Sequence, residues 1–176
     1  MFKQVFQKSK NTVILVKDSH ALEQVDAMVL PGGESTTISK NMVKSGLFTA
    51  LKKRIDNKDI AVMGTCAGCV LLSTSLVRPS DDIELLKAMD IEVQRNAFGR
   101  QCESFEYPIV FSSFKETYPA VFIRAPAITK TGKNVQILAT INEKIVAARQ
   151  NRFLALSFHP ELTMDARIHS YFLELL

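Results

Sequence analysis

Short apolar runs alternate with longer amphipathic segments in the first half of the chain. The runs TVILV (12–16), AMVL (27–30) and IAVM (60–63) are apolar almost throughout, which is typical of strands buried in a parallel sheet. Between the last two, residues 36–57 carry apolar side chains near the 3.6-residue spacing of a helix. A second helix is predicted over 66–76. This alternation predicts β-α units joined by right-handed crossovers.

The second half of the chain is richer in strand patterns. Six runs predict strands, at 91–95, 103–107, 120–124, 135–140, 144–150 and 153–158. The turn sequences TGKN and RQNR are short enough to join neighbouring strands as hairpins. A final amphipathic helix is predicted over 165–176. The pattern as a whole predicts a flavodoxin-like, three-layer α/β fold, in which a mostly parallel sheet carries an antiparallel extension.

Composition narrows the class of protein. The chain has 176 residues, 47% hydrophobic and 23% charged, which suits one globular domain with its own core. It contains no apolar run of the ~20 residues that a membrane helix needs, and its beginning does not resemble a signal peptide. Three cysteines do not form a disulfide framework, so a reducing cytoplasm is expected. The net charge of +4 comes from scattered basic residues, which favours a solvated surface over a nucleic-acid site.

The strand at 60–63 runs into the sequence G-T-C-A-G (64–68) and then into a helix. This is the pattern of a nucleophile elbow with cysteine in place of serine, in which the tight turn leaves no space for neighbouring side chains. A helix N-terminus beside Cys66 favours its thiolate form. Two alternatives stay open: a redox pair of Cys66 with Cys69, and an inert buried thiol. Two cysteines are too few for a zinc site, which takes about four ligands.

A candidate base lies in the sequence SFHPEL (157–162). Proline favours an extended conformation at the preceding His159, and residues two apart in an extended chain project to the same side. Glu161 is therefore expected to reach the His159 ring and to orient it towards Cys66. His20 and His169 have no comparable surroundings, and we interpret them as surface or packing residues.

A Gly-Gly turn follows the strand at 27–30, in the sequence VLPGGEST (29–36). Backbone N–H groups freed by two glycines suit an oxyanion hole, and Ser35 or Thr36 is expected to cap the helix that follows. Binding of a phosphate is a weaker interpretation because no G-K-[ST] follows. The third interpretation is a turn that only connects the strand to the helix.

Five motifs in order, LPGGEST, GTCAG, RNAFGRQ, FIRAP and SFHPEL, resemble the class I (triad) glutamine amidotransferases. Within that group the chain resembles the glutaminase subunits of pyridoxal 5′-phosphate synthases. The resemblance implies hydrolysis of L-glutamine to glutamate and ammonia without a metal or cofactor of its own. It also implies a protein partner, a (β/α)8 synthase subunit that takes up the ammonia, and no nucleic-acid or membrane partner.

The resemblance also implies roles for individual residues. The catalytic triad would be Cys66, His159 and Glu161. The oxyanion donors would be the amides of Gly33 and Ala67. The positions that match the glutamine-binding residues of the family are Gly33, Glu34, Ser35, Arg95, Ile123 and Arg124.

The chain departs from the family at its beginning, because the first strand and a Leu-Gln-Gly loop have no counterpart in it. We therefore expect a single glutaminase domain over 1–176 that is shorter at its N-terminus than the family. In a flavodoxin-like sheet the absent strand would lie between the strands at 12–16 and 27–30. A relative that keeps the triad residues without catalysing the reaction is thus the second hypothesis, and a thiol-redox protein using Cys66 and Cys69 is the third.

Overall fold

The computed structural model describes residues 11–99 and 104–176. One sheet has the strand order β1-β2-β10-β9-β7-β4-β3, with β8 paired to β9 beside this path. Its first three strands are parallel neighbours: β1 (Ala27–Leu30), β2 (Ala61–Thr65) and β10 (Phe153–Leu156). The others are β3 (Ser73–Leu76), β4 (Met89–Gln94), β7 (Ala127–Thr131), β8 (Gln136–Ile141) and β9 (Lys144–Gln150). A separate hairpin consists of β5 (Ser104–Ile109) and β6 (Tyr118–Ile123).

The sheet is mixed, and its strand directions divide it into blocks. The β1-β2-β10 block and the β3-β4 pair are parallel. Between them, β9 is antiparallel to β10, β8 and β7, and β7 is antiparallel to β4. The predicted α/β fold with an antiparallel extension is thus confirmed, and the parallel pairing is confined to the two ends of the strand order.

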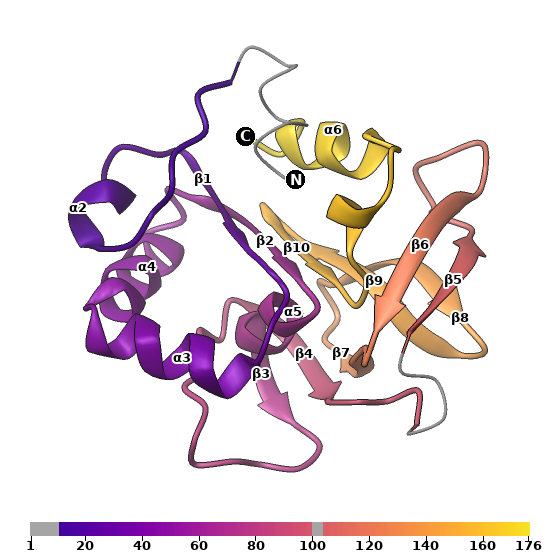
Figure 1. Cartoon of the computed structure of the whole chain (residues 1–176), viewed down its shortest axis with the longest axis horizontal. Coiled ribbons are helices and arrows are strands. Elements are labelled where there is room, and N and C mark those ends of the chain that lie inside the picture. The colour runs from indigo at the N-terminus through magenta and orange to yellow at the C-terminus, as the bar shows by residue number, and fades with distance from the viewer. Residues whose placement is uncertain (1–10, 100–103) are drawn as a thin grey trace.

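Helices cover both faces of the sheet, which gives the predicted three layers (Figure 1). One face packs under α2 (Ser19–Leu22), α3 (Ser35–Lys44), α4 (Leu47–Asp56) and α5 (Ala67–Leu72). The other face packs against α6 (Arg167–Leu173) and against buried residues of the β5-β6 hairpin. Each face has its own apolar cluster, because strands such as β2 and β10 are buried on both sides.

Two predicted helices have different bounds in the structure. The helix predicted over 36–57 is divided into α3 and α4 at Gly46, whose φ of 74° belongs to the left-handed region that glycine readily adopts. The helix predicted over 66–76 ends at Leu72, and Ser73–Leu76 forms β3 instead. The apolar spacing alone did not separate a short helix from the strand that follows it. The final helix is present but shorter than predicted.

The strand predicted over 12–16 is wrong, since these residues belong to no strand. Their valines serve a different purpose: Val13 packs against the cluster on one face of the sheet and Val16 against the cluster on the other. Leu15 between them is 75% exposed. The apolar residues of this run are therefore used for packing, without the ladder hydrogen bonds of a strand.

One of the two predicted hairpin turns does not form a hairpin. TGKN (131–134) follows β7, but β7 and β8 do not pair with each other. The hairpin is made instead by β8 and β9 through Asn142 and Glu143, which have φ values of 45° and 66°. Positive φ at both central residues is the signature of a type I′ turn. The turn RQNR does join a hairpin, that of β9 and β10.

Candidate active site

The nucleophile elbow is present between β2 and α5. Cys66 has a φ of 49°, a conformation that is strained for a residue with a side chain. Its N–H donates to the carbonyl of Leu156 at the end of β10 (2.8 Å), which ties the turn to the neighbouring strand. The two flanking glycines have no space for a side chain. A Cβ on Gly64 would lie 2.5 Å from the Gly68 backbone, and one on Gly68 would lie 2.1 Å from the Leu30 carbonyl oxygen.

His159 follows β10, and its position is set by a second cross-strand bond. Its N–H donates to the carbonyl of Val121 in β6 (2.8 Å). Its Nδ1 lies 2.8 Å from Oε1 of Glu161. The predicted contact is therefore made, although Pro160–Leu162 forms a 3-10 turn rather than an extended chain. The turn brings Glu161 back towards the ring, so the contact was correctly predicted from a local geometry that does not occur.

The histidine and its carboxylate are largely shielded from water, with side chains 11% and 13% exposed. Burial lowers the pKa of His159, but the Cys66 thiol and the Glu161 carboxylate outweigh this effect and raise the pKa to about 9. Nδ1 is taken by Glu161, and the buried Nε2 has no hydrogen-bond partner among the described residues. The arrangement leaves Nε2 as the nitrogen available for proton transfer with Cys66 or a substrate.

Gly32 contributes to the site in a way that the sequence motif did not reveal. A Cβ on Gly32 would lie 2.2 Å from Cε1 of His159 and 2.9 Å from its Nδ1. The imidazole ring therefore packs directly against the backbone that follows β1. Gly33, the predicted oxyanion donor, has a φ of 144°, which L side chains rarely adopt. The two glycines thus have separate functions, one in making space and the other in turning the chain.

Glu34, which was predicted as a glutamine-binding residue, is the N-cap of α3. Its carboxylate accepts hydrogen bonds from the N–H groups of Thr36 (3.1 Å) and Thr37 (2.7 Å). These bonds, that of Thr37 above all, lower the pKa of Glu34 to about 2. The prediction that Ser35 or Thr36 caps this helix is wrong, because the longer glutamate side chain occupies that position. Ser35 is buried at the start of the helix.

The remaining predicted binding residues come from other strands and from the start of α5. The Cys66 Sγ lies 3.8 Å from the carbonyl oxygen of Ile123, at the end of β6. Arg124 comes next, in the left-handed region with a φ of 42°. Arg95 follows β4, and its Nη2 lies 3.4 Å from the Glu34 carboxylate. Ala67 is the first residue of α5 and is buried. Of these positions, Ile123 and Ala67 lie next to Cys66, while Arg95 is placed by its contact with Glu34.

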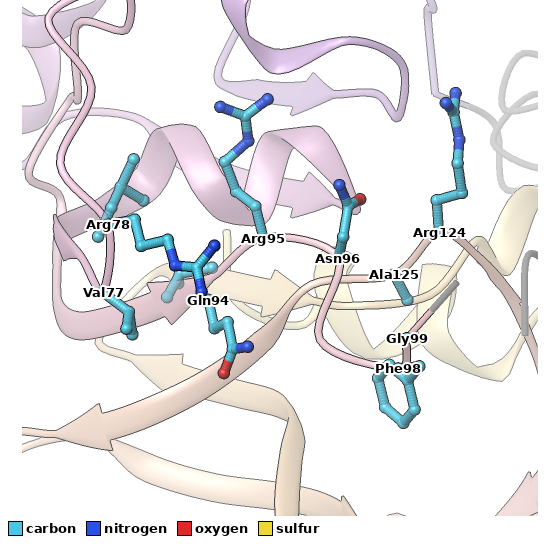
Figure 2. A pocket seen from close by; sticks show the side chains of 11 residues that line it. Val77, Arg78, Gln94, Arg95, Asn96, Phe98, Gly99, Arg124 and Ala125 are labelled. Carbon is cyan, nitrogen blue, oxygen red and sulfur yellow. The ribbon is translucent and has the colours of Figure 1, made fainter. Parts of the chain in front are cut away.

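A pocket of about 670 Å³ adjoins this site, and Figure 2 shows the side chains that line it. Arg95 and Arg124 are among them, and so is Arg78, which sequence reasoning had not singled out. Cys66 and His159 do not line it. Residues 100 and 101 of the RNAFGRQ motif, and Cys102, lie outside the described residues.

The second cysteine of the elbow differs from the first. Cys69 is fully buried in the cluster beneath α5. Burial, with a smaller contribution from nearby Cys66, raises the pKa of its thiol, which favours the unreactive form. This environment supports packing rather than redox chemistry.

Two further features are absent from the described residues. No group of three or more His, Cys, Asp or Glu is placed there to hold a metal. No helix in the same residues is long and apolar enough to cross a membrane.

Comparison with known proteins gives a consistent result. Residues 2–176 match the SNO glutamine amidotransferase family. A protein of Oenococcus oeni, "Pyridoxal 5'-phosphate synthase subunit PdxT", is 50% identical over 92% of this chain and 83% of its own length. Two relatives have the same name. The one from Thermococcus kodakarensis is 44% identical over 92% of this chain and 82% of its own length. The one from Thermosipho africanus is 45% identical over 98% of this chain and 90% of its own length.

Solved structures extend the likeness to three dimensions. A crystal structure described as a glutamine amidotransferase superposes with a TM-score of 0.91, at 39% identity, and covers 98% of this chain and 90% of that one. A glutamine amidotransferase from Thermotoga maritima, at 17% identity and a TM-score of 0.59, shares the fold.

Proposed function

The chain belongs to the SNO glutamine amidotransferase family, and from this premise we propose that it is the glutaminase subunit of a pyridoxal 5′-phosphate synthase. It hydrolyses L-glutamine to glutamate and ammonia. The observation that carries the proposal is that a strained Cys66 interacts with a buried His159, whose Nδ1 is held by Glu161. That constellation fits acyl transfer through a thioester.

In the first half of the reaction, the Cys66 thiolate adds to the side-chain carboxamide carbon of glutamine. The oxyanion that forms is stabilised by the backbone N–H groups of Gly33 and Ala67, the two donors that the family resemblance implies. Collapse of this intermediate breaks the C–N bond. His159 donates its proton to the departing nitrogen, which leaves as ammonia, and a γ-glutamyl thioester remains on Cys66.

In the second half, the now neutral His159 accepts a proton from water, and the resulting hydroxide adds to the thioester carbon. The C–S bond then breaks, which returns the Cys66 thiolate and releases glutamate. Glu161 keeps Nδ1 as the protonated nitrogen, so that Nε2 exchanges the proton in both halves. The raised pKa of His159 supports this exchange, because the imidazolium is its resting form at neutral pH.

The substrate's free α-carboxylate and α-ammonium require partners as well. Arg124 directly follows Ile123 in the chain and supplies a guanidinium group, and the carbonyl of Ile123 is an acceptor beside Sγ. Guanidinium groups bind carboxylates with two parallel hydrogen bonds. The Glu34 carboxylate is engaged at α3, so we assign its backbone, rather than its side chain, to the glutamine site.

The partner is the synthase subunit of the same complex, which we propose to be a (β/α)8 barrel that receives the ammonia directly. Direct transfer keeps ammonia from protonation and loss in bulk solvent. The glutaminase itself takes no metal or cofactor in this proposal.

The test is release of glutamate and ammonia from glutamine, measured with and without the synthase subunit. Cys66→Ala and His159→Ala are expected to lower kcat by ~10³-fold or more, since either removes a group that forms or transfers a bond in every cycle. Cys69→Ala is the matched control and is expected to stay near wild type. Equal loss for both cysteines would point to a redox pair instead. If the wild-type chain releases no ammonia even with its partner, the second hypothesis is correct, and the chain is a relative that does not catalyse the reaction.

A further inference from the structure

The pocket beside the candidate active site is lined by three arginines. It lies where β3 and β4 end, and Arg78, Arg95 and Arg124 contribute to its wall together with the amides Gln94 and Asn96 (Figure 2). No aspartate or glutamate is among the described residues that line it. A cavity of about 670 Å³ is large enough for a small organic molecule.

Two of these arginines follow the ends of neighbouring strands. β3 and β4 are parallel, with Leu76 opposite Val93. The N–H of Val77 also donates to the carbonyl of Val93 (3.1 Å). Arg78 and Arg95 come just after these two strands, in a bend and a turn, and both line the pocket. Like charges that line one pocket repel each other.

The charge of this group is poorly compensated by the protein. Arg95 meets the Glu34 carboxylate at 3.4 Å, but the same carboxylate accepts the two N–H groups that begin α3. Arg78 and Arg124 make no hydrogen bond or ion pair with the other described residues, and both are exposed. Of the three guanidinium groups, only that of Arg95 meets a carboxylate of the described residues. The pocket therefore offers excess positive charge to a ligand.

We propose that this pocket binds the phosphate group of a small phosphate monoester, held by Arg78 and Arg95. A phosphate monoester carries between one and two negative charges at neutral pH, with three acceptor oxygens. It can bind two guanidinium groups at once, whereas a carboxylate carries a single charge. The buried side chains of Leu76 and Val93, with Phe98, give the organic part of the ligand an apolar surface.

This phosphate site is distinct from the thiol but adjoins it. Neither Cys66 nor His159 lines the pocket, while Arg124 directly follows Ile123, whose carbonyl lies 3.8 Å from Sγ. Arg124 is thus left for the α-carboxylate of glutamine, and Arg78 has no part in the proposed glutamine site. Phosphate binding can be measured with no glutamine present. The test of this site therefore does not depend on whether the chain hydrolyses glutamine.

The experiment is calorimetric titration of the full chain with inorganic phosphate at low salt. Arg78→Ala is expected to weaken binding at least tenfold, because a hydrogen-bonded charged partner is removed. Arg78→Lys, which keeps the charge but not the fork, is expected to fall between the two. Lys133→Ala is the matched control, since it removes one exposed positive charge outside the pocket, and it should stay within twofold of wild type.

A second set of titrations identifies the class of ligand. Glycerol phosphate and pyridoxine 5′-phosphate are expected to bind at least as tightly as inorganic phosphate, while pyridoxine binds at least tenfold more weakly. A preference of tenfold or more between the two esters would show which organic part fits the apolar surface. The proposal is overturned if wild type binds no phosphate, if Arg78→Ala and Lys133→Ala behave alike, or if pyridoxine binds as tightly as its phosphate ester.

Discussion

The junction of β1, β2 and β10 and the edge formed by β3 and β4 are separated in the sheet by β9 and β7, and they are constructed in opposite ways. At the junction, Gly32, Gly64 and Gly68 leave no space for a Cβ, and backbone bonds cross from strand to strand. At the edge, exposed arginines line an open pocket. The comparison suggests that the junction is specified by shape and the edge by charge, and each part can be tested separately.

The largest effect is expected from Gly68→Ala. Its Cβ would lie 2.1 Å from the Leu30 carbonyl oxygen, a backbone atom that cannot move without shifting β1. We expect the free energy of unfolding to fall by about 3 kcal/mol or more, as for overpacked cores. Urea denaturation measures this change.

Gly46→Ala is the control for this substitution. It has a positive φ of 74° but nothing within 4 Å of the added Cβ, so it tests backbone strain alone. We expect a loss of about 1 kcal/mol. Equal losses for the two variants would mean that crowding at the elbow is unimportant.

Gly32→Ala is expected to affect catalysis more than stability. The new methyl group would displace the His159 ring, a side chain that can move, rather than a strand. Misplacement of a catalytic group by about 1 Å costs on the order of 10²-fold in rate, so kcat for glutamine should fall by about that factor. Gly132→Ala crowds the Asp90 side chain outside the site and should leave kcat unchanged. A normal kcat in Gly32→Ala would contradict the proposed contact.

The contrast between junction and edge also explains what the sequence revealed. The elbow around Cys66 and the His159–Glu161 contact are local motifs, each within five residues, and both were predicted. Gly32 and Arg78 act through segments far apart in the chain, and the pairing that brings them into place is visible only in the fold. The strand predicted at 12–16 was wrong for the same reason. The hydrophobicity of a run does not show whether a neighbouring strand is available to pair with it.

Glu161→Gln tests the electrostatics of the junction. Loss of the carboxylate should lower the pKa of His159 from about 9 by one unit or more, measured by NMR titration of the ring. Because the folded pKa is raised above the ordinary 6.5, its stabilising effect is complete below pH 6.5 and is lost as the pH rises through 9. The variant should therefore be destabilised more at pH 6 than at pH 10. Glu174→Gln, at an exposed position, should shift neither quantity.

Glu34→Ala tests the boundary between the two regions, because Glu34 caps α3 and meets Arg95. Loss of an N-cap costs about 1 kcal/mol of stability, and urea denaturation at pH 7 should show this. The pKa of Glu34 is lowered to about 2, so its contribution is present above about pH 4.5 and is lost as the pH falls through 2. Glu34→Asp retains a capping carboxylate and should be close to wild type. A full effect of Glu34→Ala at pH 2 would exclude the charged cap.

The smallest effect is expected from Arg78→Ala, and its sign is the informative part. A substitution at the junction can only weaken packing, but removal of one of the three arginines that line the pocket relieves repulsion between like charges. We expect the free energy of unfolding to rise by no more than about 0.5 kcal/mol at low salt, and the gain to disappear at 1 M salt, where the Debye length is about 3 Å. Added phosphate should stabilise wild type but not the variant, because a ligand stabilises only the state that binds it. Lys133→Ala should show neither effect. A loss of stability at both salt concentrations would mean that Arg78 supports the fold, and that the edge, like the junction, is specified by packing.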